Sequence, residues 1–242
     1  MQNTYLAATG QQWLIQSTPW GFSYILDANA EQCLDVEGAS TADGASIDQT
    51  ACTGATNQLW SVVPAHTTTQ VNLSPFFNSY AIVTDGTQAT DGGLGLGYAL
   101  SASTLGPAAS WNENPFAFGP VNFQNAVSNA TVALPAGNFS SLQFLALAVY
   151  GSQPNQQLQV TYTDGTTAVV PQSFSDWGSP MNYPGESQAI QAPYRIGPSG
   201  SGSPGTWYVY GYSLPLNNAK TVRSVQLPAD PNIFVLAMTL VK

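Results

Sequence analysis

The side chains best suited to chemistry lie close together between residues 175 and 195. The segment "FSDW" is followed by "NYPGES" and then by "YR", which puts aromatic rings beside carboxylate and guanidinium groups. A flat ring can cover the apolar CH face of a sugar, and charged groups make strong hydrogen bonds to hydroxyls. The alternative is a structural ion network that holds a long loop. The residues concerned are Asp176, Trp177, Tyr183, Glu186, Tyr194 and Arg195.

The same stretch raises the question of catalysis. Glycoside hydrolysis needs two carboxyl groups about 5–9 Å apart, one of them with a raised pKa. Asp176 and Glu186 are the only tempting pair, and no second cluster of acids supports them. The sole histidine, His66, lies in a Thr-rich segment, which argues against a Ser-His-Asp triad and against histidine-based zinc chemistry. No phosphate-binding glycine loop is present. We therefore predict no catalytic residues in this chain.

Two further features could serve a ligand or could be purely structural. Asp85 and Asp91 lie in the glycine-rich segment "TDGTQATDGG", where carboxylate oxygens could hold a structural calcium ion. Asp-Gly pairs are also ordinary turn formers. Trp111, in "SWNENPF", could stack on a ligand or pack inside a loop. No cofactor is required by these patterns, and calcium is the one ion that they suggest.

The composition limits the possible partners. Charged residues make up 7% of the 242 residues, the formal net charge is −9, and 43% of residues are hydrophobic. This apolar content is ample for a buried core, so the chain is not predicted to be disordered. No apolar run is long enough to span a bilayer. The negative charge disfavours nucleic acid and anionic membranes, whereas neutral polysaccharides remain open.

The chain has two cysteines, Cys33 and Cys52. They could be buried free thiols or a single disulfide. In a charge-poor, aromatic-rich chain we favour the disulfide, which implies an oxidising compartment and therefore a secreted, extracellular protein. No signal peptide precedes Gln2, so Met1 is expected to be an artificial start or the edge of a fragment.

Strand signals dominate, and helical periodicity is hard to find. The apolar run 142–151 predicts a buried strand, and 157–174 predicts a hairpin that turns at Asp164-Gly165. Further strands are expected within 206–216, 221–228 and 232–241, and 197–206 is expected to be a surface loop. Many short strands with Gly and Pro turns indicate an all-β protein, either a sandwich or a barrel.

The composition changes near residues 63–73, where a Thr run suggests a linker. We expect one unit over residues 1–64, a linker over 65–70 and a larger unit over 71–242. In the first unit "QQW" (residues 11–13) and "QLW" (residues 58–60) are one motif seen twice, which suggests a repeat. The Trp of each repeat is expected to fill the core, and the Gln to satisfy backbone groups at a turn.

The first unit resembles one complete repeat and part of another from a ricin B-type lectin β-trefoil, a carbohydrate-binding fold. The resemblance is carried by "CLDV" (residues 33–36), Gly44, Ile47, Cys52, Asn57 and the Gln58-Leu59-Trp60 ending. It implies that the two cysteines are bonded to each other. It also implies that Asp35 and Asn57 hold sugar hydroxyls, with Asp48 or Gln49 lending a polar edge.

This unit departs from the family in two ways. The family places an aromatic ring two residues before the second cysteine, where this chain has Thr50. Loss of that stacked ring should weaken the pocket, so the repeat could be a scaffold alone. The family also closes its barrel with three repeats. We therefore expect the missing part to lie upstream in a longer parent, to be replaced by packing on the second unit, or to be supplied by a homo-oligomer.

The second unit resembles a β-sandwich module found at the C-terminal end of secreted bacterial glycoside hydrolases. The patterns that carry it lie at residues 84–101, 174–190 and 194–202 and in the ending 221–240. The resemblance implies a jelly-roll sandwich of the galactose-binding type.

Together these observations predict a non-catalytic, carbohydrate-binding accessory region of a secreted bacterial polysaccharide-degrading enzyme whose catalytic domain is not in this chain. The expected partner is a neutral polysaccharide or oligosaccharide, held by weak contacts at shallow sites. The alternative is a structural or assembly module that makes contacts between chains or stabilises an absent catalytic domain. A small hydrolase that uses Asp176 and Glu186 is the third hypothesis.

Overall fold

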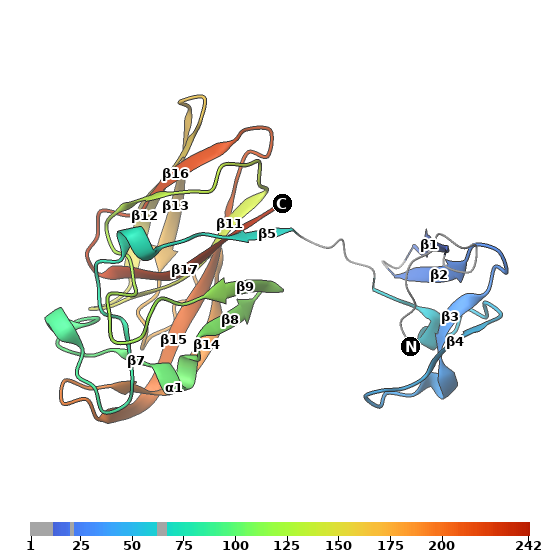
Figure 1. The fold of residues 1–242 in the computed structure, drawn as a ribbon, viewed down its shortest axis with the longest axis horizontal. Helices are drawn as coiled ribbons and strands as arrows, with labels where there is room; N and C mark the ends of the chain where they lie inside the picture. The colour runs from blue at the N-terminus through green and yellow to red at the C-terminus, as the bar shows by residue number, and fades with distance from the viewer. Residues whose placement is uncertain (1–11, 20–21, 62–66) are drawn as a thin grey trace. The chain divides into compact units, whose positions relative to one another are not determined.

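The computed structural model describes residues 12–19, 22–61 and 67–242, and Figure 1 shows their fold. The chain divides into two compact units, Met1–Ala65 and His66–Lys242, which we call the lobe and the sandwich. Regular structure in both is almost entirely strand, so the predicted all-β class is confirmed.

The lobe is a small antiparallel sheet with the strand order β1-β2-β3-β4. Two short 3₁₀ turns, η2 and η3, follow β3 and precede Trp60. The strands are β1 (Trp13–Ser17), β2 (Ser23–Asp27), β3 (Cys33–Val36) and β4 (Ile47–Thr50), and the turns are η2 (Glu37–Ala39) and η3 (Thr56–Gln58).

The motif at the end of the repeat behaves as the sequence predicts. Gln58 is 1% exposed, and its Nε2 donates to the Ala51 carbonyl while its Oε1 accepts from the Thr53 amide. The half-buried indole of Trp60 donates to the Leu34 carbonyl at 3.0 Å. The disulfide between Cys33 and Cys52 is present, which confirms that prediction.

The prediction that the Trp of the motif fills a core does not hold for the first copy. Trp13 is 40% exposed rather than in a core, and Gln11 lies outside the described residues. All five residues of β1 are exposed, including Leu14 and Ile15. Among the described residues of the lobe, no second layer covers this strand.

The sandwich is built from two antiparallel sheets, as expected for a jelly-roll type of architecture. One has the order β10-β16-β12-β13 and the other β14-β15-β11-β17-β5. The first sheet contains β10 (Thr131–Ala133), β16 (Val222–Gln226), β12 (Gln153–Tyr162) and β13 (Thr167–Phe174). The second contains β14 (Glu186–Ile196), β15 (Gly202–Pro215), β11 (Ser141–Ala148), β17 (Ile233–Val241) and β5 (Thr68–Gln70).

Two boundaries differ from the sequence predictions. Residues 68–70, assigned to the linker, form β5 and pair with β17 at the edge of the five-stranded sheet. Residues 202–206, assigned to a surface loop, begin β15 and pair with the end of β14. In both cases pairing with a long neighbouring strand satisfies backbone groups of a segment whose own residues give no strand signal. The hairpin at Asp164-Gly165 forms as predicted, between β12 and β13.

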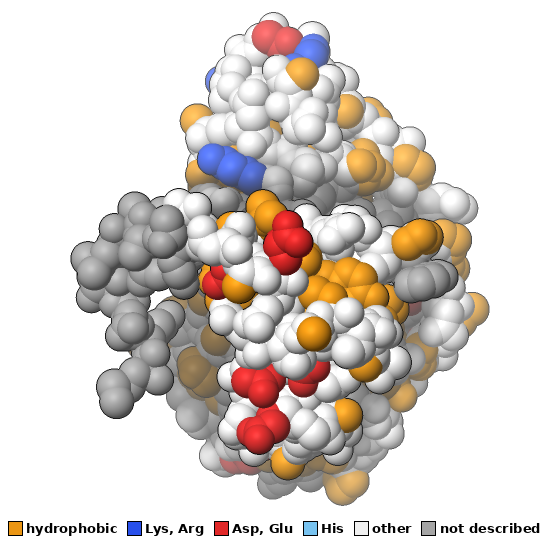
Figure 2. All heavy atoms as spheres, turned by 90° about the vertical axis from the view of Figure 1, so that its right-hand side faces the viewer, with side chains coloured by type: hydrophobic (Ala, Val, Ile, Leu, Met, Phe, Trp, Pro, Cys, Tyr) orange, Lys and Arg blue, Asp and Glu red, His pale blue; other side chains and the backbone are white. Residues whose placement is uncertain are grey.

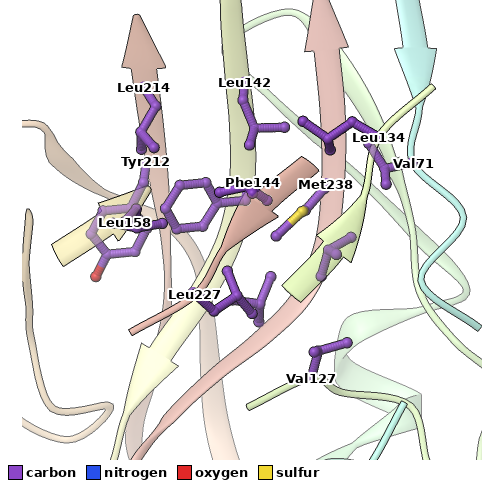
Figure 3. Packing of buried hydrophobic residues seen from close by; sticks show 14 of the residues in the cluster. Val71, Val127, Leu134, Leu142, Phe144, Leu158, Tyr212, Leu214, Leu227 and Met238 are labelled. Atoms are coloured by element: carbon purple, nitrogen blue, oxygen red, sulfur yellow. The ribbon is translucent and has the colours of Figure 1, made fainter. Parts of the chain in front are cut away.

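The main core lies between the two sheets. Phe144 from β11 and Tyr212 from β15 stack with ring centroids 5.1 Å apart, and Leu158 of the opposite sheet lies beside them (Figure 3). Phe174 packs against Tyr212 at 4.8 Å.

The five-stranded sheet is also covered on its outer face, by residues 79–126. Alternate residues of β11 therefore enter different clusters: Phe144 and Ala146 face the inner core, whereas Leu145 and Leu147 face the outer layer. Burial on both faces explains why β11 and β17 read as continuous apolar runs. The outer layer contains β6 (Ile82–Val83), β7 (Leu100–Ser101), α1 (Ala102–Leu105), β8 (Ala108–Trp111) and β9 (Asn114–Ala117), with the turn η5 (Thr90–Gly92). The turn η4 (Ser74–Phe76) precedes this layer, and its Phe76 packs against the inner core.

The surface carries few charges. Figure 2 shows one face on which most side chains are neither acidic nor basic. Within the described ranges one ion pair forms, between Lys220 and Asp164 at 2.9 Å. No helix among these residues is long and apolar enough to cross a membrane.

Candidate functional site

In the lobe, the structure brings Asp35 and Asn57 together. Asn57 Nδ2 donates to Asp35 Oδ1 at 2.8 Å and to the Val36 carbonyl at 3.0 Å. Strand β3 supplies the carboxylate, and the turn η3, which the buried Gln58 anchors, supplies the amide. Asp35 is only 7% exposed, so a ligand could reach one edge of it at most.

The neighbouring strand supplies the rest of the predicted pocket. Asp48 stands directly opposite Asp35 in the β3–β4 register, and its side chain is exposed. Gln49 makes a different contact, because its Nε2 donates to Asp27 Oδ2 at 3.4 Å. Thr50, which stands where the family has its ring, is opposite Cys33 and offers no stacking surface.

Asp27 is a structural residue of the lobe. Its Oδ1 accepts hydrogen bonds from the amides of Ala30 and Asn29, at 2.9 and 2.7 Å. These bonds lower the pKa of Asp27 and hold the turn between β2 and β3.

In the sandwich, Asp176 comes directly after β13, as predicted, but its carboxylate is used to shape loops. Oδ2 accepts from the Gly151 amide and Oδ1 from the Gly178 amide, both at 2.8 Å. Its carbonyl accepts from the Tyr210 hydroxyl at 2.8 Å. Asp176 therefore joins the ends of two loops and a strand.

Glu186 is likewise committed to structure. Its Oε1 accepts from the Ser175 hydroxyl at 2.6 Å, and its Oε2 accepts from the Ser175 amide and the Tyr212 hydroxyl, both at 2.8 Å. Burial, followed by the nearby Glu186 charge, raises the pKa of Tyr212, so that hydroxyl stays a donor. Tyr183 lies half-buried in the same loop, with its carbonyl accepting from the Glu186 amide.

Arg195 is not part of the ion network considered from the sequence. Its guanidinium lies between two rings, 3.5 Å from the centroid of Tyr98 and 3.7 Å from that of Trp207. No carboxylate of the described residues comes within ion-pair distance. Burial lowers its pKa, against the opposing influence of Tyr98 and Asp176. Cation–π contacts thus replace the expected charge pairs.

The expectation that Trp177 stacks on a ligand is wrong. The residue is 4% exposed, its ring lies 4.9 Å from that of Trp207, and Arg195 approaches it at 5.0 Å. The indole instead packs into the outer apolar layer of the sandwich, where burial of the ring stabilises the fold.

The two aspartates of the glycine-rich segment have different environments. Asp85 accepts from the hydroxyls of Ser101 and Tyr194, and the first of these bonds contributes most to lowering its pKa. Asp91 is exposed at a left-handed turn residue with φ 49°. Among the described residues no group of three or more His, Cys, Asp or Glu side chains could hold a metal. Calcium at Asp85 and Asp91 would need carbonyl and water ligands, and it stays a prediction.

Trp111 is half-buried at the end of β8. Its ring lies flat on Gly211, where a Cβ would come within 2.1 Å of the indole, and its Nε1 donates to the Ser187 hydroxyl at 2.9 Å. The same β8–β9 hairpin ends over a polar cavity that includes Asn114 and Gln143. Sequence reasoning missed these two residues, although Gln143 is the one polar side chain within the apolar run of β11.

Asp176 and Glu186 are the two carboxylates that the sequence offered for catalysis. Within the described ranges the tempting carboxylates, Asp176 and Glu186, accept hydrogen bonds from amides and hydroxyls at each of their oxygens. These hydrogen bonds give both carboxylates a structural role in the sandwich.

Comparison with known proteins agrees with both units. Residues 9–94 match the ricin-type beta-trefoil lectin domain-like family, which confirms the resemblance of the lobe. The match extends past the lobe into residues 67–94, which fold with the sandwich, since Thr68–Gln70 pair with β17. No curated protein matches the chain.

Residues 67–242 match the family described as AziU2-like beta-sandwich domain, and this match covers more than half of the chain. It spans the two sheets and the outer layer described above. The chain therefore belongs to the AziU2-like β-sandwich domain family, with a ricin B-type lectin-like lobe preceding the sandwich.

Proposed function

We propose that this chain binds neutral carbohydrate without reacting with it, as an accessory region of a secreted bacterial polysaccharide-degrading enzyme. The observation that carries the proposal is the Asp35–Asn57 pair in the lectin-like lobe. The disulfide is in keeping with an oxidising, extracellular setting.

The pair leaves hydrogen-bonding capacity on the lobe surface. Asp35 Oδ1 is held by Asn57, whereas Oδ2 accepts no hydrogen bond from the part of the chain that the structure describes. A carboxylate oxygen fixed in this way is a strong acceptor for a sugar hydroxyl. Because Asn57 is itself fixed by the Val36 carbonyl, little side-chain entropy is lost when a ligand binds.

The charge of the lobe favours a neutral ligand. Residues 1–65 contain six acidic residues and no lysine or arginine. Asp48, directly opposite Asp35, adds a second carboxylate near the pair. Phosphate and carboxylate ligands would be repelled, while hydroxyl groups can donate to both acids.

The low exposure of the Asp35–Asn57 pair should limit the affinity of the site for a sugar. Asp35 is largely covered, and Thr50 supplies no ring, so each site should be shallow and weak. A weak site is sufficient for an accessory region, because tethering it to an enzyme raises the effective concentration at an insoluble substrate.

The test is retention on insoluble polysaccharides, with cellulose, xylan, chitin and starch granules as probes. Asp35→Ala should reduce retention about tenfold or more, because a hydrogen bond to a charged group contributes about 1.5–3 kcal/mol. Asn57→Ala should weaken it less, since the carboxylate remains but loses its orientation. Asp43→Ala, which removes an exposed acid elsewhere in the lobe, is the matched control.

Circular dichroism of each variant shows whether the lobe has kept its fold. If folded Asp35→Ala and Asn57→Ala are retained like the unmodified chain on every polymer that binds it, the assigned pocket is wrong.

An assembly role is the second candidate, and one observation favours it. Five large apolar side chains are exposed on the lobe: Trp13, Leu14, Ile15, Phe22 and Ile47. Exposed apolar surface of this kind is typical of protein interfaces. The occupant would be another copy of this chain or a neighbouring domain of a longer protein. Light scattering separates these ideas, because a strictly monomeric chain at high concentration contradicts self-assembly.

A further inference from the structure

A small cavity lies under the tip of the β8–β9 hairpin, at one end of the five-stranded sheet. Its volume is about 300 Å³. The hairpin tip supplies Asn112, Glu113 and Asn114, and the sheet supplies Ser141, Gln143 and Ser213. The cavity is at the lower limit of small-molecule sites, which suits one ring rather than a long ligand.

The polarity of this corner is unusual for the sheet. Gln143 stands opposite Ser213 on one side and opposite Thr239 on the other, so three neighbouring strands present a polar row. Two residues further along β11, the same face carries Leu145 and packs into the outer apolar layer. A core position would be filled most simply by an apolar side chain, so a polar row needs a separate reason.

Internal hydrogen bonds use only part of this polar row. Thr239 is satisfied, because its hydroxyl donates to the Pro115 carbonyl at 2.6 Å. Gln143, 4% exposed, accepts from Asn114 Nδ2 at 2.9 Å, and Asn114 is 3% exposed. In the described part of the chain, Gln143 Nε2 donates to no group and Asn114 Oδ1 accepts from none, yet neither atom is sealed from solvent. A donor and an acceptor therefore remain at the wall of the cavity.

The hairpin turn places an asparagine and a glutamate in an unfavourable backbone conformation beside the cavity. Asn112 and Glu113 both have positive φ, 49° and 64°. Asn tolerates this conformation well, and Gly would normally take the second position. Glu113 is an exposed residue that lines the cavity, and it adopts the left-handed region in spite of the steric cost of its side chain.

Trp111 holds the hairpin against the sheet, although it is not among the residues that line the cavity. Trp111 directly precedes the turn and pairs with Asn114 across the hairpin. Its indole lies on Gly211, two residues before Ser213 on the same strand. The indole therefore fixes the position of the hairpin tip, which carries Asn112, Glu113 and Asn114.

We propose that this cavity binds a single neutral sugar ring, such as the end of a polysaccharide chain. Gln143 Nε2 donates to a ring hydroxyl, while Asn114 Oδ1 and the Glu113 carboxylate accept from hydroxyls. Among the described residues, no lysine, arginine or histidine lines the cavity, and Glu113 repels anionic ligands. The inference rests on the proposed carbohydrate function, but it names a different site in a different unit.

The experiment is saturation-transfer NMR on the full chain. The probes are free D-glucose, D-galactose, D-mannose, D-xylose and N-acetyl-D-glucosamine, with D-glucuronate as the anionic comparison. At least one neutral sugar should receive saturation, and D-glucuronate should not.

The decisive variant is Glu113→Gly, because it removes the carboxylate and relieves the positive φ. It should weaken sugar binding about tenfold while the thermal midpoint stays equal or rises. Gln143→Met, which keeps the shape but not the donor, should abolish binding. Gln188→Met changes an exposed glutamine on the same sheet and is the matched control.

The lobe variant separates this proposal from the previous one. Asp35→Ala should lower retention on insoluble polymer and leave the free-sugar signal unchanged. The cavity proposal is overturned if no neutral sugar receives saturation, or if folded Glu113→Gly and Gln143→Met bind like the unmodified chain. It is also overturned if the signal disappears with Asp35→Ala alone.

Discussion

The lobe and the sandwich hold their folds by different means. In the described part of the lobe, Cys33 is the one apolar residue that is fully buried, and the other buried residues are Ser23, Asp27, Asp35 and Gln58. The sandwich has a continuous apolar core between its sheets and a second apolar layer outside one of them.

The difference shows how a small β unit is stabilised when its described residues bury little apolar surface. The lobe relies on a disulfide and on side chains that bond to backbone, as Gln58 and Trp60 do. The sandwich is stabilised mainly by burial of apolar surface. Polar groups at its rim can therefore serve a purpose other than stability. Substitutions in each unit test this contrast.

Truncation of a ring in the central aromatic stack should destabilise the chain more than any other change considered. Phe144→Ala removes a fully buried ring from β11 that stacks on Tyr212. Loss of burial and the remaining cavity should lower the free energy of unfolding of the sandwich by about 3–5 kcal/mol. Chemical denaturation, followed by hydrogen exchange of peptides from each unit, measures the effect. Exchange in the lobe should be unchanged, and Phe123→Ala, at a 65% exposed ring, should have almost no effect.

Removal of the disulfide should act on the lobe in the same selective way. Cys33 and Cys52 are separated by 19 residues, and a loop of this size implies a stabilisation of about 3 kcal/mol. Because the described residues of the lobe form no apolar core that could compensate, the Cys33→Ser, Cys52→Ser double variant should lose protection from exchange throughout β1–β4. A lobe that keeps its protection after this change would show that an apolar core, and not the crosslink, maintains it.

The polar anchor of the lobe should have a smaller effect. Gln58→Leu keeps the approximate size but leaves the Thr53 amide and the Ala51 carbonyl without their partner. Because buried, unsatisfied groups cost about 1–3 kcal/mol each, the lobe should be destabilised by a similar amount. Gln32→Leu, at an exposed glutamine, is the control. Equal stability of the two variants would contradict the anchoring role of Gln58.

Acidification should give the smallest effect. The hydrogen bonds from Ser101 and Tyr194 lower the pKa of Asp85 in the folded sandwich. A lowered folded-state pKa stabilises the fold above about pH 4 and loses that contribution as the pH falls through the folded-state value. Asp85→Asn should therefore reduce the acid-induced fall in the melting temperature of the sandwich. Because Asp85 is exposed, the change should be modest and weaker in high salt.

The acid response of the lobe can be measured in the same way. Amides of Ala30 and Asn29 lower the pKa of Asp27, so Asp27→Asn should alter the acid response of the lobe alone. If Asp85→Asn and Asp27→Asn leave both acid responses as they were, these hydrogen bonds do not contribute to pH-dependent stability.

Much of the fold could be predicted from residue order because the relevant forces are local. Asp164-Gly165 specifies a hairpin since glycine accepts positive φ, and the apolar runs of β11 and β17 predict buried strands. The edge strand β5 could not be found in this way, because Thr68–Gln70 become a strand only through pairing with β17.

The candidate sites were less predictable than the fold. Asp35 and Asn57 were found through a family resemblance, and the structure joins them at 2.8 Å. Trp177 was misplaced, because sequence alone cannot tell which rings the outer layer covers. The cavity at Gln143 was missed, because its walls come from a hairpin and three strands far apart in the chain.

By itself, the sequence determined the all-β class, the two units, the disulfide and the charge-poor character of the chain, since composition, turn residues and side-chain periodicity act over a few residues. The tertiary structure alone decided which polar groups are left with bonding capacity. Asp176, Glu186 and Arg195 are used internally, whereas Gln143 and Asn114 keep a donor and an acceptor at a cavity. The reason is that hydrogen-bond satisfaction depends on neighbours brought together across sheets and layers, and residue order does not specify those neighbours.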